Sequence, residues 1–343
     1  MEWVKKIIKA LLLLEVIYLV LLNGALRLPL TQEFINDFRP EKFHVAWDKA
    51  WTWYPFRVHV RGVSGHGQAR SQQWQFSAKE VSGSISLLPL LSKRVWVNDV
   101  EAVDIDYRQR PRLMPGRDYS AMLEFFPEIE GREMTDADIS PFPDRRPWHV
   151  SIDDIRVSGT HSVWFYQLKG QLQTDIEAEL KVRTLGGPFS MSVNSLDIQM
   201  GTVYANESHE ILQYGNFKGS LRFSEFVPRE NKNIGILNYL SFDIESDIGM
   251  DSLGFVNLFL LNFDGVKVGG RGAAGGRFNF EQGTVMPGTD LTIDATNLDV
   301  KVMDLDIAGN GTINLKMERQ TEESLAIVFG FRDLNITHKE DNT

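Results

Sequence analysis

Apolar and polar residues alternate along most of the chain, most clearly between residues 56 and 107. A period of two places one apolar and one polar face on each β-strand. Glycines, Asn98 and Asp99 separate the alternating segments and favour turns. The pattern predicts four strands here, with the run Leu88-Pro-Leu-Leu91 in a buried position. The predicted inward residues of this stretch are Val58, Val60, Trp74, Phe76, Val95, Val97, Val103 and Ile105.

The same alternation resumes at Trp148 and continues almost to the C-terminus. The apolar positions near the end of the chain include Leu291, Ile293, Leu298 and Val300. No βαβ pattern is present, and only residues 231–239 favour a short helix. The prediction is an all-β body, an elongated antiparallel sheet curled into an apolar groove. A filled core gives the same alternation, so an open groove and a packed sandwich both remain as interpretations.

Residues 108–147 interrupt the strand pattern with six prolines and a run of acidic residues. Within this stretch only Tyr119–Phe126 has a helical pattern. Long connections are typical of lids and binding loops, although a simple spacer has the same composition.

The N-terminus predicts a membrane anchor. Lys5, Lys6 and Lys9 precede an apolar run from Ala10 to Leu26, which as a helix is about 25 Å long and approaches the thickness of a bilayer core. The basic flank favours a cytoplasmic N-terminus and an exported body. A cleavable signal peptide is the alternative, with a shorter apolar run and a small-residue site. Glu15, in the middle of the span, is a candidate contact to a membrane-protein partner, or a protonated residue among apolar neighbours.

Leu30–Phe38 follows the anchor and has the pattern of a short amphipathic helix. Trp47, Trp51, Trp53 and Tyr54 come next, as an interfacial aromatic belt or as a cap on the β-body. The predicted organisation is therefore an anchor at 1–29, a juxtamembrane segment at 30–55, a first β-module at 56–147 and a second at 148–343.

The composition excludes several classes of function. A net charge of −10 disfavours nucleic acid as a partner, and the absence of cysteine excludes disulfides and thiolate chemistry. The seven histidines do not have metal-ligand spacing. The glycine-rich run 269–276 lacks the lysine and the helix of a phosphate loop, and is typical of a bulge or hairpin. No residue set predicts catalysis, and no cofactor or metal is expected.

One stretch, SISLLPLLSKRVWVNDVE (Ser84–Glu101), followed by DIDYRQRP (Asp104–Pro111), resembles the start of AsmA-like proteins, which are related to TamB and to bridge-like lipid-transfer proteins. The segments Gly276–Val300 and Gly309–Leu315 also resemble repeats of this family. The resemblance implies an anchor in the inner membrane of a Gram-negative bacterium and a β-groove in the periplasm. It further implies a role in moving phospholipid towards the outer membrane.

Two functions follow as hypotheses. In the first, acyl chains bind along the inward apolar residues named above. In the second, the chain is a non-enzymatic structural or assembly subunit of an envelope complex, with a filled β-body.

Overall fold

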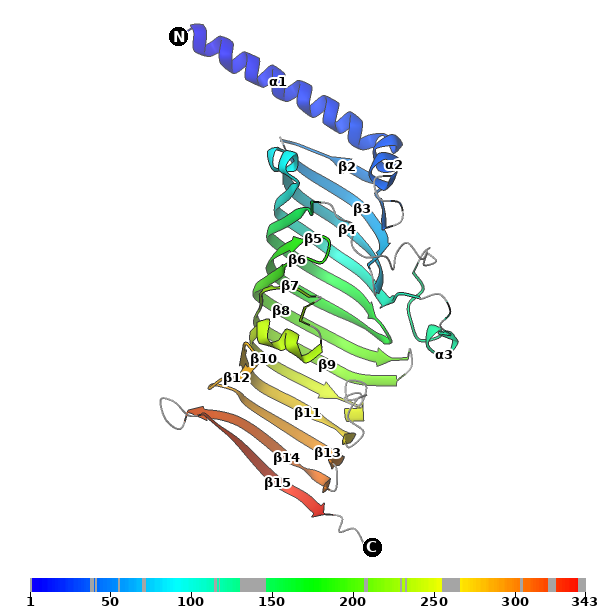
Figure 1. The fold of residues 1–343 in the computed structure, drawn as a ribbon, viewed down its shortest axis with the longest axis vertical. Coiled ribbons are helices and arrows are strands. Elements are labelled where there is room, and N and C mark those ends of the chain that lie inside the picture. The colour runs from blue at the N-terminus through cyan, green and yellow to red at the C-terminus, as the bar shows by residue number, and fades with distance from the viewer. Residues whose placement is uncertain are drawn as a thin grey trace. The chain divides into compact units, whose positions relative to one another are not determined.

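In the computed structural model, two helices precede a β-rich body (Figure 1). The structure describes residues 2–37, 40, 42–54, 56–69, 72–113, 116, 118–129, 146–206, 209–228, 230–231, 233–254, 266–302, 305–319 and 325–338. Contacts divide the chain into two compact units. Unit 1 holds residues 1–166 and 177–189, and unit 2 holds residues 167–176 and 190–343. The predicted module boundary at residue 147 therefore lies inside unit 1.

Unit 1 begins with α1 (Glu2–Arg27) and α2 (Pro29–Asp37), close to the predicted anchor and amphipathic helix. By length and composition, α1 is able to span a membrane, and none of its most apolar window is buried. The strands that follow are β1 (Phe43–Ala46), β2 (Lys49–Trp51), β3 (Arg57–Gln68), β4 (Gln72–Ser86), β5 (Arg94–Pro111) and β6 (His149–Phe165). The short helices η1 (Leu88–Ser92) and α3 (Ser120–Leu123) interrupt them.

The 56–107 stretch forms three strands, not the four predicted. Val95 and Val103 lie in one strand, β5, as predicted, but the predicted strand from Ile85 to Leu91 is instead the end of β4 followed by the 3₁₀ helix η1. Pro89 at the start of η1 has no N–H for a β-ladder, which is why this run leaves the sheet. The prediction that this run is buried is wrong, because Leu88 is 82% exposed and Leu91 is 88% exposed.

Most strand pairs are antiparallel as predicted, but β5 and β6 are parallel, with Arg94 opposite His149 and Gln109 opposite Phe165. The fully antiparallel prediction is therefore wrong at this pair. Hairpin neighbours are antiparallel, whereas a long connection lets the chain return to the starting end of the previous strand. The proline-rich stretch after Pro111 provides that connection.

Unit 2 contains most of the remaining elements: β8 (Phe189–Ala205), β9 (His209–Phe226), η3 (Asn233–Tyr239), β10 (Leu240–Met250), β11 (Val266–Glu281), β12 (Thr284–Val285), β13 (Asp290–Val302), β14 (Leu305–Arg319) and β15 (Leu325–His338). Strand β7 (Leu168–Arg183) contributes residues to both units, and the first residue of β8, Phe189, belongs to unit 1. Between β9 and β15 the described neighbours pair antiparallel in sequence order, with β12 beside β11. The predicted helix at 231–239 is η3, and the glycine-rich run lies inside β11 with a register shift at Gly269, as a bulge.

Candidate functional site

One face of the unit 1 sheet is apolar and only half-buried. Phe76 lies opposite Gly65 and Tyr107, while Trp74 lies opposite Gly67 and Gln109. Directly opposed residues share a face, so these side chains form one row. Both Phe76 and Trp74 are partly exposed, and their rings stack with centroids 5.9 Å apart. The structure thus brings these two predicted inward residues together on a surface that protein atoms only partly cover.

The other half of the same strands carries a second apolar row. Val60 lies opposite Val81, which lies opposite Ala102, and Ala102 lies beside Val157. Val58, Val95 and Val97 belong to this half too, with Val97 between Ile85 and Ile152. Sequence reasoning missed Val81 and Ala102, because they are out of phase with Trp74, Phe76 and Ile105 at the other end of their strands, and it named no inward residue on β6, the strand of Val157.

The change of phase occurs at a line of residues crossing β3 to β6, here called the kink row: Gly62, Lys79, Asp104 and Gly159. Gly62, Asp104 and Gly159 have φ angles of 58°, 52° and 103°, in the left-handed region. Lys79 and its neighbour Glu80 both point to solvent, with side chains 70% and 46% exposed. Because these two consecutive residues both point outward, the alternation shifts by one residue, and Val81 lies on the same apolar face as Ala78.

Val103 is separated from the apolar face by this shift. Its register partner is Glu80, which forms an ion pair with Arg61 at 2.8 Å. Val103 therefore lies on the polar face, although Ile105, two residues later, lies opposite Ala78 among the apolar residues. The predicted alternation from Val103 to Ile105 is wrong because Asp104 between them has a left-handed backbone conformation.

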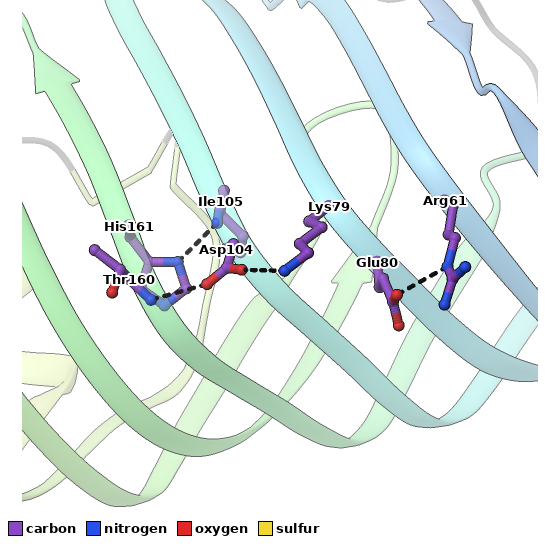
Figure 2. A network of polar contacts seen from close by, with 7 residues as sticks. All are labelled: Arg61, Lys79, Glu80, Asp104, Ile105, Thr160 and His161. Carbon is purple, nitrogen blue, oxygen red and sulfur yellow. Dashed lines mark hydrogen bonds and ion pairs between the residues drawn. The ribbon is translucent and has the colours of Figure 1, made fainter.

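Polar contacts stabilise the kink row, as Figure 2 shows across β3 to β6. The Asp104 carboxylate accepts a hydrogen bond from the Thr160 N–H at 3.1 Å and forms an ion pair with Lys79 at 3.4 Å. The Thr160 N–H, followed by the Lys79 charge, lowers the pKa of Asp104. A Cβ at Gly159 would lie 2.4 Å from the Asp104 carboxylate, so only glycine leaves room for this contact.

His161 lies next to the kink row and is almost fully buried. Its Nδ1 accepts a hydrogen bond from the Ile105 N–H at 2.9 Å, which requires an unprotonated Nδ1 (Figure 2). Burial lowers the pKa of His161 below 6.5, and the nearby Asp104 charge only partly opposes this. The kink row is therefore built around a neutral histidine.

We expect unit 1 to lose stability as the pH falls below about 6.5, because the unfolded chain binds a proton at His161 more readily than the folded chain does. The loss should level off below the folded pKa. In the variant His161→Asn, the side-chain oxygen still accepts from Ile105 but does not titrate, so the slope should become shallower. Urea unfolding of the full chain in detergent, followed by tryptophan fluorescence between pH 5 and 8, measures this. Equal slopes for parent and variant would exclude His161 as the titrating group.

In unit 2 the predicted inward residues of β13 also share one face. Leu291 lies opposite Gly276 and Leu315, and Ile293 lies opposite Ala274 and Ile313. Leu298 and Val300 join them beyond Asn297, whose φ angle of 52° shifts the alternation as in unit 1. The structure therefore brings all four residues together on β13.

An aromatic cluster extends this face and was not singled out from the sequence. Phe242 lies opposite Phe280, with ring centroids 5.2 Å apart, and packs edge-on against Phe278 at 5.1 Å. All three rings are half-buried. The alternation of phenylalanine in Phe278-Asn-Phe280 is the signal that predicts them.

The chain itself covers part of the apolar face of unit 2 and the strand ends of unit 1. In unit 2, Leu298 is 4% exposed because Met250 and Leu253, at and after the end of β10, pack with it. In unit 1, Phe126 packs edge-on against Tyr166, and the Pro127 carbonyl accepts from Arg110 at 3.3 Å. Residues of the proline-rich connection thus pack on the strand ends, which a pure spacer would not do.

The polar face of unit 2 has a shallow depression over β10, β11 and β13, with Asp247, Asp290 and Asp294 in its lining. Each carboxylate has a protein partner: Tyr214 for Asp247, Lys316 for Asp290 and Thr312 for Asp294. Within the described ranges, no group of three or more His, Asp or Glu residues is placed to hold a metal ion.

The end of α1 is fixed to the β-body by polar contacts. Asn23 donates to the Thr52 carbonyl and accepts from the Thr52 N–H, both at 3.0 Å. Tyr18 accepts a hydrogen bond from the Phe56 N–H at 3.1 Å. Glu15 is half-buried. It lies three residues before Tyr18 and seven before Leu22, so the three side chains share one face of the helix. This places Glu15 on the side of α1 that faces the body.

In the predicted aromatic segment, Trp47 and Trp51 contact other residues of the chain, whereas Trp53 faces solvent. Trp47 donates to the Leu26 carbonyl at 3.3 Å, and Trp51 stacks on His59 with centroids 5.5 Å apart. Trp53, by contrast, is 72% exposed.

A comparison with protein-family models found no match to this chain, and a search of curated proteins found none.

Proposed function

We propose that this chain is a membrane-anchored lipid-binding protein of the AsmA-like type, in which acyl chains lie along the apolar faces of the β-body. The anchor would be α1 in a bacterial inner membrane, with the body in the periplasm and a part in phospholipid movement or outer-membrane homeostasis. The observation that carries the proposal is that each unit has half-buried large apolar residues on one face, Trp74 and Phe76 in unit 1 and Phe242 and Phe278 in unit 2.

The balance of energies favours a lipid on such a surface. Each methylene buried on binding contributes about 0.8 kcal/mol, so an acyl chain lying along several strands gains substantial binding free energy. The polar face and the ionic contacts of the kink row remain in water. Binding of this kind is passive and requires no catalytic residue. The resemblance of Ser84–Pro111 to AsmA-like proteins supports the same conclusion.

In unit 2, the local coverage by Leu253 limits where lipid would lie. Leu298 is already packed against the chain itself and is not available to an acyl chain. The proposed contact residues in unit 1 are therefore Val58, Val60, Trp74, Phe76, Val95, Val97 and Ile105, and those in unit 2 are Leu291, Ile293 and Val300, with the Phe242 cluster.

A photo-crosslinking residue placed at Phe76 or Val97 of the full chain should capture phospholipid in cells. The matched control is Ser77, which is exposed and neighbours Phe76 on the opposite face of the same strand. Strong capture at Phe76 with little at Ser77 is the expected result. Equal capture at both positions would indicate general membrane contact and contradict the proposal.

The variant Phe76→Asp should remove lipid from the purified protein and leave the fold intact. A carboxylate against an acyl chain costs more than about 1.4 kcal/mol, which corresponds to at least about a tenfold loss of bound lipid. Native mass spectrometry measures the lipid, and far-ultraviolet circular dichroism measures the fold. Unfolding of this variant would instead indicate a filled core and favour the structural-subunit hypothesis.

A further inference from the structure

The most exposed apolar residues of the β-body of unit 1 gather around η1. They are Leu87, Leu88 and Leu91, together with Trp53, Tyr54 and Phe56 before β3, and are here called the strand-end patch. Leu88 and Leu91 each expose more than four-fifths of their surface. Leucine side chains in contact with water are unfavourable in free energy, and a partner that covers them would remove this cost.

Hydrogen bonds fix the two parts of this patch together. The Ile85 N–H, at the end of β4, donates to the Phe56 carbonyl at 2.8 Å, and the Phe56 N–H donates to Tyr18 of α1 at 3.1 Å. Lys93 ends η1 in a left-handed conformation, and its N–H donates to the Leu90 and Pro89 carbonyls. The two parts of the patch are therefore connected to each other and to the anchor helix.

The direction of α1 shows which end of the strands faces its N-terminal part. Along α1, Tyr18 contacts Phe56, Asn23 contacts Thr52, and Leu26 contacts Trp47. The helix thus runs beside β2 in the opposite sense, and its residues before Tyr18 extend beyond Phe56. Figure 1 shows η1, coloured cyan, at the strand ends on the side of the sheet towards which the N-terminal part of α1 extends.

We propose that the strand-end patch inserts into the headgroup region of the membrane leaflet from which α1 emerges. The body would then contact the bilayer at two places, the helix and the patch. This inference rests on the membrane anchoring proposed above, but it does not depend on lipid binding along the apolar faces.

The chemistry of the patch fits a bilayer surface better than a protein partner. Tryptophan and tyrosine favour the headgroup region, where one end of the ring is apolar and the other is wet. Lys93 and Arg94 directly follow η1, so a basic pair borders the leucines in a chain whose net charge is −10. Long basic side chains extend from apolar surroundings to anionic headgroups.

The absence of cysteine gives a direct experiment. The full chain with the single substitution Leu88→Cys carries an environment-sensitive fluorophore and is reconstituted into vesicles of phosphatidylcholine and phosphatidylglycerol. Nitroxide-labelled lipids quench a probe in the membrane, and iodide quenches a probe in water. The matched control is Val328→Cys on β15, an apolar and exposed residue outside the patch.

The expected result is several-fold stronger nitroxide quenching at Leu88 than at Val328, with iodide showing the reverse order. Leu13→Cys in α1 reports the anchor itself. Lipid quenching at Leu13 without quenching at Leu88 would overturn the patch proposal and leave the anchor intact. Lack of quenching at both positions would overturn the anchoring as well.

A second copy of the chain is the competing occupant. Rapid disulfide formation between two Leu88→Cys chains, without nitroxide quenching, would show that the patch is an interface between copies, and would overturn the proposal. Loss of lipid capture at Phe76 with intact quenching at Leu88 would contradict the proposed function and leave the patch proposal standing.

Discussion

Replacing Gly276 by alanine should lower the free energy of unfolding of unit 2 by about 3 kcal/mol. Gly276 has a φ angle of 128°, which residues with a side chain rarely adopt, and a Cβ there would lie 2.0 Å from the Asp290 carbonyl oxygen. That oxygen belongs to the backbone of β13, so neither strand is able to move without breaking ladder hydrogen bonds. Strain and steric overlap therefore both act against the variant.

The neighbouring glycine is the matched control. Gly275 has no left-handed conformation, and the atom nearest to an added Cβ is the Ser246 carbonyl oxygen at 3.5 Å, an ordinary contact. Gly275→Ala should change stability by less than about 1 kcal/mol, and in the stabilising direction, since glycine weakens a strand interior. Hydrogen exchange of β10, β11 and β13 in the full chain measures both variants. Similar effects at the two positions would contradict the argument.

Replacing Leu298 by alanine should destabilise unit 2 by about 2–4 kcal/mol, because the side chain is packed by Met250, Leu253 and Ala295 and a cavity would remain. The same substitution at Leu291 should cost about 1 kcal/mol, since its side chain is only half-buried and little packing is lost.

These two leucines separate a filled region from an open one on a single strand. Hydrogen exchange of β13 and β14 measures the difference, and tryptophan fluorescence serves as a control because all eight tryptophans lie before residue 166, in unit 1. Equal losses at Leu298 and Leu291 would mean that the whole face is a packed core. Bound lipid should raise the cost at Leu291 and leave the cost at Leu298 unchanged.

Alternation with a period of two predicted most of the strands and most of the residues on the apolar faces. Trp74 with Phe76, and Leu291 with Ile293, lie together as their spacing predicts. The restart of the pattern at Leu298 was visible too, since Ala295 and Leu298 are three residues apart. The same displacement between Ala78 and Val81 marks the kink row, but its meaning is clear only from the backbone conformation of Asp104.

Other features could not be predicted from local pattern. The position of Val103 depends on one left-handed residue, and a single-residue shift moves a side chain to the other face. The parallel β5–β6 pair depends on where a long connection returns, which no alternation records. The leucines of η1 were predicted to be buried from hydrophobicity alone, although Pro89 within the run is the residue that ends β-pairing.

The parallel pair also determines the order in which the chain can assemble. Hairpins such as β3–β4 close through a short connection, whereas joining β5 to β6 closes one that is about ten times as long, at an extra entropy cost of about 2 kcal/mol. Contacts distant in sequence form slowly. During synthesis we therefore expect β3 to β5 to pair first, and β6 to join the edge of β5 only when the long connection has closed.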